Sequence, residues 1–262
     1  MIEAGQVADL GIQKYAGKVA IITGAGTGLG AAIAMRLSAL GATVVLNDLS
    51  PIEVYGLEET IRSYGNQAIA VVGDISVQRD VNQLVQVAEG LSGAVDILVN
   101  NAGILKRTKV EEITEDEWDQ VIDVNLKGPF LTSRAVISQM KIRRSGKLVN
   151  VASMAGRATS TLGGAHYSAS KAGLLGLTRH LAREFAPYNI NVNAVCPGIV
   201  NTNMVRQSLD TEEERELLSH IPFGRFADPQ EIALLVEFLV SDGASYITGA
   251  SVDIHGGEII IQ

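Results

Sequence analysis

Short apolar runs alternate with amphipathic segments along most of the chain. Apolar runs of this length, bounded by glycine and polar residues, are typical of strands buried on both faces of a sheet. They predict strands at residues 18–23, 43–47, 67–72, 95–99, 147–151, 190–195 and 250–254. Between them, apolar residues recur at the helical period, which predicts helices at residues 31–38, 53–64, 77–91, about 115–142, about 166–187 and 229–240.

This alternation predicts a single domain with an α/β fold. Parallel strands need helical crossovers, which are right-handed, so we expect a doubly wound seven-stranded parallel sheet in a three-layer αβα sandwich. The predicted domain spans residues 17–262, and residues 1–16, which lack a clear period, are expected to form an N-terminal extension. The charged run at 212–216 indicates a solvated helix in a mobile substrate lid at about 203–222.

Composition narrows the classes of function. The 262 residues are 47% apolar, so the chain can bury a large core, and the net charge of −8 argues against nucleic-acid binding. The sequence contains no run of about 18 apolar residues, so we predict no membrane span. The single cysteine, Cys196, is expected to be a buried small hydrophobe, and the four histidines show no ligand spacing. We therefore expect no metal and a soluble, reduced, cytoplasmic protein.

A glycine-rich turn follows the first predicted strand. Gly24, Gly28 and Gly30 follow the pattern T-G-x-x-x-G-x-G, which differs from the G-x-G-x-x-G of the usual dinucleotide fingerprint. Glycines between a strand and a helix let the backbone approach a pyrophosphate, and the helix N-terminus offers free N–H groups. The turn predicts a cofactor site, and a purely structural turn is the alternative.

Asp48 ends the second predicted strand, 18 residues after Gly30. An acid at about this offset accepts hydrogen bonds from the ribose hydroxyls of a dinucleotide and repels a 2′-phosphate. Leu49 and Ser50 follow, so no cation stands where a phosphate would need one. This arrangement predicts NAD(H) over NADP(H), and the alternative is that Asp48 caps the next helix.

Tyr167 and Lys171 lie one helical turn apart, so their side chains share a helix face. A phenol titrates near ~10 in water, and a neighbouring ammonium is expected to lower that pKa. The pair could therefore supply the acid/base that hydride transfer to or from a carbonyl needs. The alternative is an ordinary solvated helix face.

Chemically distinctive residues fall at the carboxyl ends of the predicted strands, where open α/β sheets bind their ligands. These residues are Gly24, Asp48, Asp74, Asn100, Ser153 and Pro197. Their convergence predicts a dinucleotide-dependent enzyme.

From residue 18 to about residue 257 the sequence resembles the short-chain dehydrogenase/reductase family. The resemblance rests on the turn at 23–30, Asp74, Asn100-Asn101-Ala102-Gly103, Asn125, Ser153, Tyr167-x-x-x-Lys171 and Pro197-Gly198. It implies a Rossmann-like fold, a nicotinamide cofactor and a catalytic tetrad of Asn125, Ser153, Tyr167 and Lys171.

The resemblance also implies a role for each of these residues. Tyr167 would be the general acid/base, and Lys171 would lower its pKa and bind the nicotinamide ribose. Ser153 would hydrogen-bond the substrate oxygen, and Asn125 would hold a water linking Lys171 to solvent. The residues expected to contact NAD are Gly24, Thr27, Gly28, Leu29, Gly30, Asp48, Leu49, Asp74, Ile75, Asn101, Ala102, Gly103, Tyr167, Lys171, Pro197, Gly198, Ile199 and Thr202.

Two features depart from the family pattern. The serine and tyrosine are 14 residues apart here, where the family often has 13, so Ser160 is the alternative to Ser153. His255, where the family usually has an aspartate, precedes Gly256-Gly257.

We therefore predict an NAD(H)-dependent oxidoreductase that interconverts a secondary alcohol and a ketone. Lys106-Arg107 resembles a basic pair of sugar-acid dehydrogenases in this family and favours a sugar acid or polyol; a cyclic alcohol also fits. The alternatives are a 3-oxoacyl thioester reductase and a catalytically silent dinucleotide-binding regulator.

His166 is expected to line the pocket or to be exposed. The resemblance implies a homotetramer that pairs the helices at about 115–142 and 166–187 across a two-fold axis.

Overall fold

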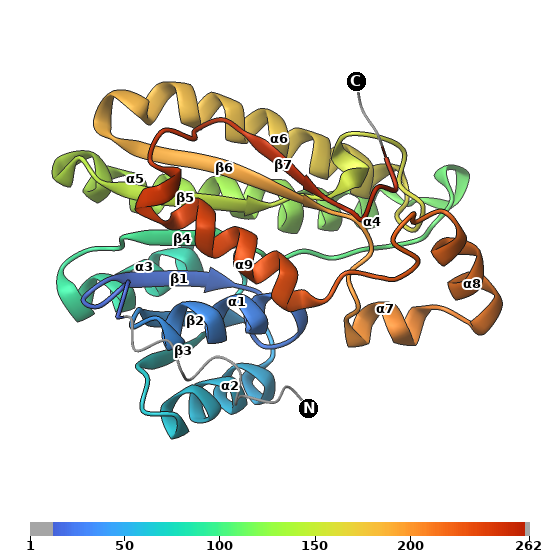
Figure 1. Ribbon diagram of the computed structural model, residues 1–262. Coiled ribbons are helices and arrows are strands. Elements are labelled where there is room, and N and C mark those ends of the chain that lie inside the picture. Colours follow the sequence, from blue (N-terminus) through green and yellow to red (C-terminus); the bar gives the residue numbers. More distant parts are fainter. Residues whose placement is uncertain (1–12, 260–262) are drawn as a thin grey trace.

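A computed structural model describes residues 13–259, which fold around one seven-stranded parallel sheet (Figure 1). The strand order β3-β2-β1-β4-β5-β6-β7 reverses between β1 and β4. Ligands bind at such a switch point, beyond the carboxyl ends of the strands. The strands are β1 Val19–Thr23, β2 Thr43–Asp48, β3 Ala68–Val72, β4 Ile97–Asn100, β5 Gly146–Val151, β6 Ile190–Pro197 and β7 Ser251–Ile254. All seven predicted strands are confirmed.

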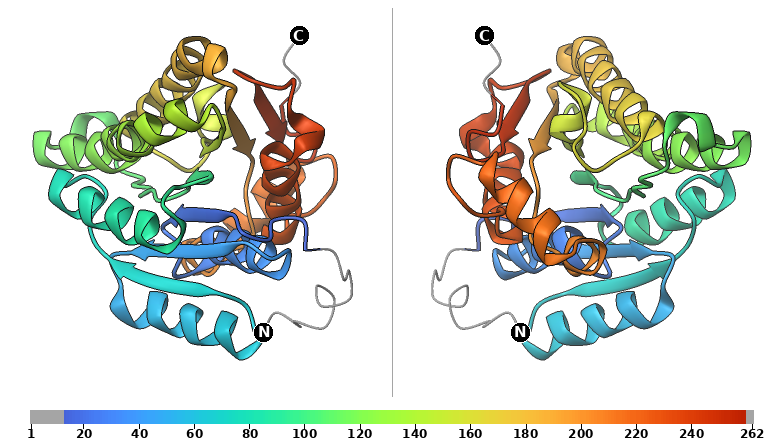
Figure 2. Two further views of the ribbon diagram at one scale, coloured as in Figure 1. Left: turned by 90° about the vertical axis from the view of Figure 1, so that its left-hand side faces the viewer. Right: turned by 90° about the vertical axis from the view of Figure 1, so that its right-hand side faces the viewer.

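Helices cover both faces of the sheet, as the two side views show (Figure 2). The helices are α1 Gly28–Ala39, α2 Pro51–Ser63, α3 Gln78–Ser92, α4 Glu115–Ile122, α5 Gly128–Arg143, α6 Ala165–Phe185, α7 Asn203–Ser208, α8 Thr211–Ser219 and α9 Pro229–Val240. The predicted three-layer, doubly wound architecture is therefore confirmed.

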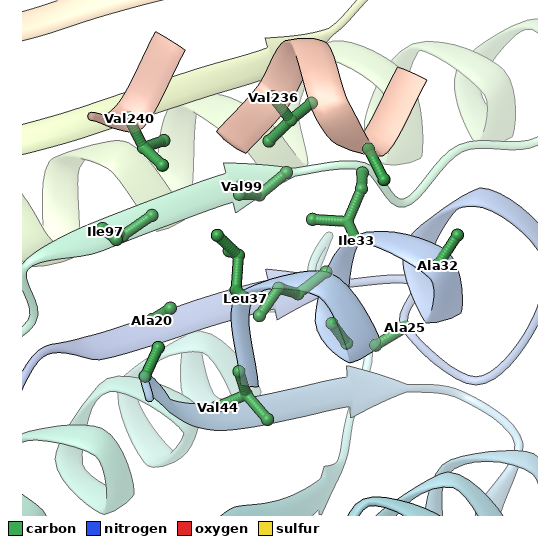
Figure 3. Close-up of a cluster of buried hydrophobic side chains, with 14 of the residues drawn as sticks. Ala20, Ala25, Ala32, Ile33, Leu37, Val44, Ile97, Val99, Val236 and Val240 are labelled. Carbon is green, nitrogen blue, oxygen red and sulfur yellow. The ribbon is translucent and has the colours of Figure 1, made fainter. Parts of the chain in front are cut away.

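The two faces of β1 enter separate cores, as alternation along a strand requires. Ala20 and Ile22 pack in one core with α1, α2 and α9, whereas Val19 and Ile21 pack in the other with α3, α5 and α6. Figure 3 shows the first core, where Leu37 of α1 lies among side chains from β1, β2, β4 and α9. Burial on both faces fixes the sheet and therefore the positions of its strand ends.

Two predicted helices differ in detail from the structure. α1 begins at Gly28, three residues before its predicted start, so the last glycines of the turn form its first helical turn. The predicted continuous helix at 115–142 is interrupted by a π-helical turn at Asp123–Lys127, which separates α4 from α5. Such turns are frequent at functional sites, and this one carries Asn125.

Residues 14 and 15 precede the predicted start of the domain at residue 17, but they pack against the domain. Tyr15 is buried in the core beside α1 and α9, and its hydroxyl donates to the Glu237 carbonyl at 2.9 Å. Lys14 and Arg36 both pair with the Glu237 carboxylate at 2.7 Å. The rest of the predicted extension, residues 1–12, lies outside the described residues. Between residues 13 and 259, no helix is long and apolar enough to cross a bilayer.

Candidate active site

A cavity of about 620 Å³ opens at the carboxyl ends of the strands, around the β1–β4 switch point. Every residue predicted to contact the cofactor lines this cavity, as does Ser153. Asn125 does not line it and lies behind the cavity wall, near Gly103 and Lys171. The sheet therefore brings segments that are distant in sequence to one site.

The glycine turn forms a cradle that side chains would fill. Gly24 and Gly28 have φ values of 60° and 56°, which favour glycine. A Cβ on Gly30 would lie 2.1 Å from the Gly24 carbonyl oxygen. Asn101 braces the turn by donating to the carbonyls of Thr23 and Gly24 at 3.0 and 2.9 Å.

The first turn of α1 faces this cradle without a side-chain cap. Thr27 occupies the N-cap position, but its side chain accepts no hydrogen bond from the helix. Free N–H groups at a helix N-terminus bind anions, and the positive end of the helix dipole favours negative charge there. The cradle therefore fits the pyrophosphate of a dinucleotide.

Asp48 lines the cavity, and two backbone hydrogen bonds fix its side chain. Its carboxylate accepts hydrogen bonds from the N–H groups of Gly26 at 2.9 Å and Ser50 at 3.1 Å. Ser50, rather than Asp48, is the N-cap of α2. The alternative interpretation of Asp48 as a helix cap is therefore wrong.

Tyr167, Lys171 and Ser153 meet in the cavity wall. Tyr167 and Lys171 extend from the first turns of α6, and Ser153 follows β5. The Ser153 and Tyr167 hydroxyls are hydrogen-bonded, and the Lys171 ammonium lies 5.7 Å from the Tyr167 ring centroid. The Ser160 hydroxyl instead accepts from the Gly163 N–H at 2.7 Å. Since Lys171 is also buried, the solvated-face alternative is excluded.

Burial controls the protonation of this pair. It raises the pKa of Tyr167, and the hydrogen bond with Ser153 only partly opposes that rise. Burial also lowers the pKa of Lys171 to about 8, while its ammonium donates to the Val151 carbonyl at 2.9 Å. Burial therefore sets the direction of the Tyr167 pKa in this structure, and the lowering of that pKa by Lys171 stays a prediction.

Asn125 joins α6 to the loop after β4. Its carbonyl oxygen accepts from the Ile104 N–H at 2.8 Å, and its amide nitrogen donates to the Ile104 carbonyl at 2.9 Å. The same nitrogen donates to Ser170 at 3.1 Å, and Ser170 donates to the Tyr167 carbonyl at 2.7 Å. The predicted water beside Asn125 stays a prediction.

Two sets of side chains differ from their predicted positions. His166 neither lines the cavity nor is exposed; it is fully buried and bonds Glu117 at 2.8 Å. Lys106 and Arg107 also lie outside the cavity lining, and Arg107 pairs with Glu213 of α8 at 2.8 Å. Lys106 and Arg107 therefore do not form a binding site for a substrate carboxylate within the cavity.

Sequence reasoning missed a set of apolar residues that line the cavity, here called the apolar wall. Its members come from the loop after β4, the segment after β5 and the start of α7, and no periodic pattern marks them. They are Ile104, Leu105, Met154, Leu162 and Val205. Their only sequence signal is their position in loops that follow strand ends.

Thr202 and Cys196 both have structural partners. The Thr202 hydroxyl caps α7 by accepting from the Val205 N–H at 3.4 Å, so its predicted contact with the carboxamide stays a prediction. Cys196 is fully buried in β6, and burial raises its pKa to about 12, as expected of a small hydrophobe.

The model of the short chain dehydrogenase family matches residues 18–213. The chain belongs to the short-chain dehydrogenase family. A 3-oxoacyl-[acyl-carrier-protein] reductase from Pseudomonas aeruginosa is 40% identical over 241 residues, which cover 92% of this chain and 97% of that protein. The chain is therefore an oxidoreductase, and its expected cofactor is a nicotinamide dinucleotide.

Two solved structures resemble the fold closely. A 3-oxoacyl-[acyl-carrier protein] reductase with bound NAD from Brucella melitensis has a TM-score of 0.87 at 33% identity, covering 98% of this chain and 95% of that one. A candidate gluconate dehydrogenase from Agrobacterium tumefaciens has a TM-score of 0.90 at 32% identity, covering 96% and 99%. Short-chain dehydrogenases with differently named substrates thus share this architecture.

Proposed function

We propose that the protein is an NAD(H)-dependent reductase of 3-oxoacyl thioesters. One observation carries this proposal: the half-buried Tyr167–Ser153 hydroxyl pair shares its cavity with the apolar wall. The wall suits an acyl chain better than the polar surface of a sugar acid, since burial without hydrogen-bond partners is costly for hydroxyl groups. The named substrate of the Pseudomonas aeruginosa relative supports the same substrate class.

The protonation of Tyr167 suits the reductive direction. A phenol whose pKa is raised stays protonated near neutral pH, so it can donate a proton to a developing alkoxide. The Ser153 hydroxyl would hydrogen-bond the same oxygen and stabilise its charge. A bound nicotinamide would supply the hydride. Lys171, next to Tyr167, would hold the ribose hydroxyls with its ammonium.

Asp48 supports NAD(H) as the cofactor. Its carboxylate lines the cavity beside Leu49, which is 63% exposed, and among the described residues that line the cavity the only cation is Lys171, beside Tyr167. The Brucella melitensis relative holds NAD, which agrees with this assignment.

We also propose a homotetramer in a reducing, cytoplasmic setting. Phe130 and Ile142 of α5 are 41% and 76% exposed, so this helix offers apolar surface to a second copy. The free, buried Cys196 suits a reducing compartment. Light scattering after gel filtration would give the mass of the assembly, and a monomer would contradict the tetramer.

The proposed function is tested by following NADH oxidation with acetoacetyl-coenzyme A and longer 3-oxoacyl thioesters. Keto sugar acids and cyclic ketones complete the panel, and NADPH replaces NADH in a parallel series. We expect thioesters to give kcat/KM values at least tenfold above the others, with NADH preferred. Turnover of sugar acids alone would support the gluconate-type alternative. NADH binding without turnover across the panel would support a silent regulator.

A further inference from the structure

His166, which directly precedes Tyr167, connects the catalytic helix to the interior of the protein. Its side chain is fully buried, and its Nδ1 accepts a hydrogen bond from the Tyr167 N–H at 3.0 Å. Because Nδ1 accepts, we assign the ring proton to Nε2, which donates to the Glu117 carboxylate at 2.8 Å. The Trp118 ring stacks on the imidazole with centroids 6.4 Å apart. The imidazole is therefore held between α4 and α6.

Glu117 extends the connection to the loop that follows β4. The Thr108 hydroxyl and His166 both donate to its carboxylate, and these bonds lower the pKa of Glu117. A second link joins the same loop to α6, because the Gly164 N–H donates to the Lys106 carbonyl at 2.8 Å. Residues 104–108 are thus attached to the start of the catalytic helix at two points.

The contacts around Gly164 explain why the His166 side chain, rather than that of the N-cap residue, accepts a hydrogen bond from the first turn of α6. Gly164 is the N-cap of α6 and has no side chain to cap the helix. A Cβ at this position would lie 2.6 Å from the Thr108 carbonyl oxygen and 2.9 Å from the imidazole. The close approach of the loop therefore excludes serine, threonine or aspartate at the N-cap. The His166 ring satisfies the Tyr167 N–H in their place.

We propose that His166 and Glu117 are positioning residues that hold Tyr167 in register with the substrate-side loop at residues 104–108. Neither residue lines the cavity, whereas Ile104 and Leu105 of this loop do. The connection therefore links the proton donor to the wall that contacts the substrate. This inference rests on the proposed function of Tyr167.

The two nitrogens of His166 can be tested separately. In His166→Asn, the Asn amide keeps an acceptor near the Nδ1 position and loses the donor to Glu117. In His166→Gln, the amide keeps a donor near the Nε2 position and loses the acceptor for Tyr167. Glu117→Gln removes the charge with little change of shape. His180→Gln is the matched control, since His180 is on the same helix, is 76% exposed and pairs with Glu184.

Hydrogen exchange in the cofactor-free protein provides a readout that does not need activity. We expect Glu117→Gln and His166→Asn to accelerate amide exchange at least about threefold in residues 104–109. His166→Gln should accelerate exchange mainly in residues 163–168, and His180→Gln should change neither segment. Unchanged exchange in residues 104–109 for both Glu117→Gln and His166→Asn would overturn the inference.

Kinetics then separate positioning from general stability. We expect kcat to fall about tenfold in the His166 and Glu117 variants, with the Kd for NADH within about twofold of the unaltered protein. Val236→Ala, a core variant in α9, provides a comparison that lowers Tm without touching this connection. A loss of kcat that only matches the Tm loss of Val236→Ala would overturn the inference.

The inference and the proposed function fail in different ways. If the unaltered protein turns over substrate and the variants match it, the inference alone is wrong. If the unaltered protein shows no turnover, the proposed function is wrong, and the exchange measurements still decide whether the loop and helix are coupled.

Discussion

The hydroxyl groups of Ser153 and Tyr167 are hydrogen-bonded to each other, although the two residues are fourteen positions apart in sequence. The intervening loop accommodates the extra residue relative to the common family spacing. Ser160 lies in this loop, and its hydroxyl accepts from the Gly163 N–H, which stabilises the turn. The geometry therefore favours Ser153 as the residue that contacts the substrate oxygen.

We expect Ser153→Ala to lower kcat about 10²-fold, because it removes a hydrogen bond to the developing oxyanion. Ser160→Ala should stay within about threefold, since only the loop hydrogen bond is lost. Steady-state kinetics with NADH and a 3-oxoacyl thioester measure both. A larger loss in Ser160→Ala than in Ser153→Ala would reverse the assignment.

Lys171 is expected to destabilise the fold at neutral pH. Its pKa is 10.5 as a free side chain and about 8 when buried, a difference worth about 3 kcal/mol. Folding disfavours its charged form, so the cost is fully present below pH 8 and disappears as the pH rises through 10.5. Lys171→Met also loses the bond to Val151, so the net gain in stability at pH 7 should be about 1–3 kcal/mol.

Thermal unfolding at pH 7 and pH 10 measures this effect. We expect Lys171→Met to raise Tm by several degrees at pH 7, by a smaller amount at pH 10, and to abolish turnover. Lys109→Met, at an exposed position in the loop before α4, is the control. A Tm at pH 7 that falls or does not change in Lys171→Met would contradict the prediction.

Arg107 and Glu213 link the loop after β4 to α8, in the segment predicted to form a substrate lid, through a partly exposed ion pair. Exposed pairs contribute little to stability, so a single substitution that breaks this pair should leave Tm nearly unchanged. Arg107→Glu places two like charges together, and we expect it to raise the substrate KM about fivefold by displacing α8. The double charge swap Arg107→Glu with Glu213→Arg should restore KM.

Measuring KM at low and high salt checks this prediction. Because screening weakens exposed pairs, the difference between Arg107→Glu and the unaltered protein should shrink at high salt. A charge-swap variant that behaves like Arg107→Glu would show that the pair does not position α8.

Asp48 is expected to set the choice of cofactor. Asp48→Ala removes the charge that would repel a 2′-phosphate, so the kcat/KM ratio of NADH over NADPH should fall at least about tenfold. Glu59→Gln, an exposed charge change on α2, is the control for net charge. An unchanged ratio in Asp48→Ala, with the protein still folded, would mean that other groups select the cofactor.

Residues at strand ends could be placed from the sequence because the sheet itself positions them. Asp48 and Pro197 end buried apolar strands and Gly24 and Ser153 follow them, and parallel strands bring their carboxyl ends together. Tyr167 and Lys171 share a helix face by spacing alone. For these residues, the local sequence pattern and the global fold predict the same position in the site.

Properties that depend on tertiary packing could not be predicted in this way. The pKa of Tyr167 rises because neighbouring segments bury it, which the Tyr167–Lys171 spacing does not reveal. The π-helical turn that carries Asn125 interrupts a region with a continuous helical pattern. Arg107 looked available for a substrate carboxylate, but its partner Glu213 is 106 residues away in sequence.

The central claim is that the Tyr167 hydroxyl donates the proton during carbonyl reduction, and Tyr167→Phe tests it most directly. This variant removes one oxygen atom and leaves the ring that packs in the cavity wall. With NADH and a 3-oxoacyl thioester, the account predicts a kcat lowered about 10²–10⁴-fold with NADH binding retained, while Tyr64→Phe, at an exposed tyrosine, stays unchanged. Near-normal turnover by Tyr167→Phe would contradict the account.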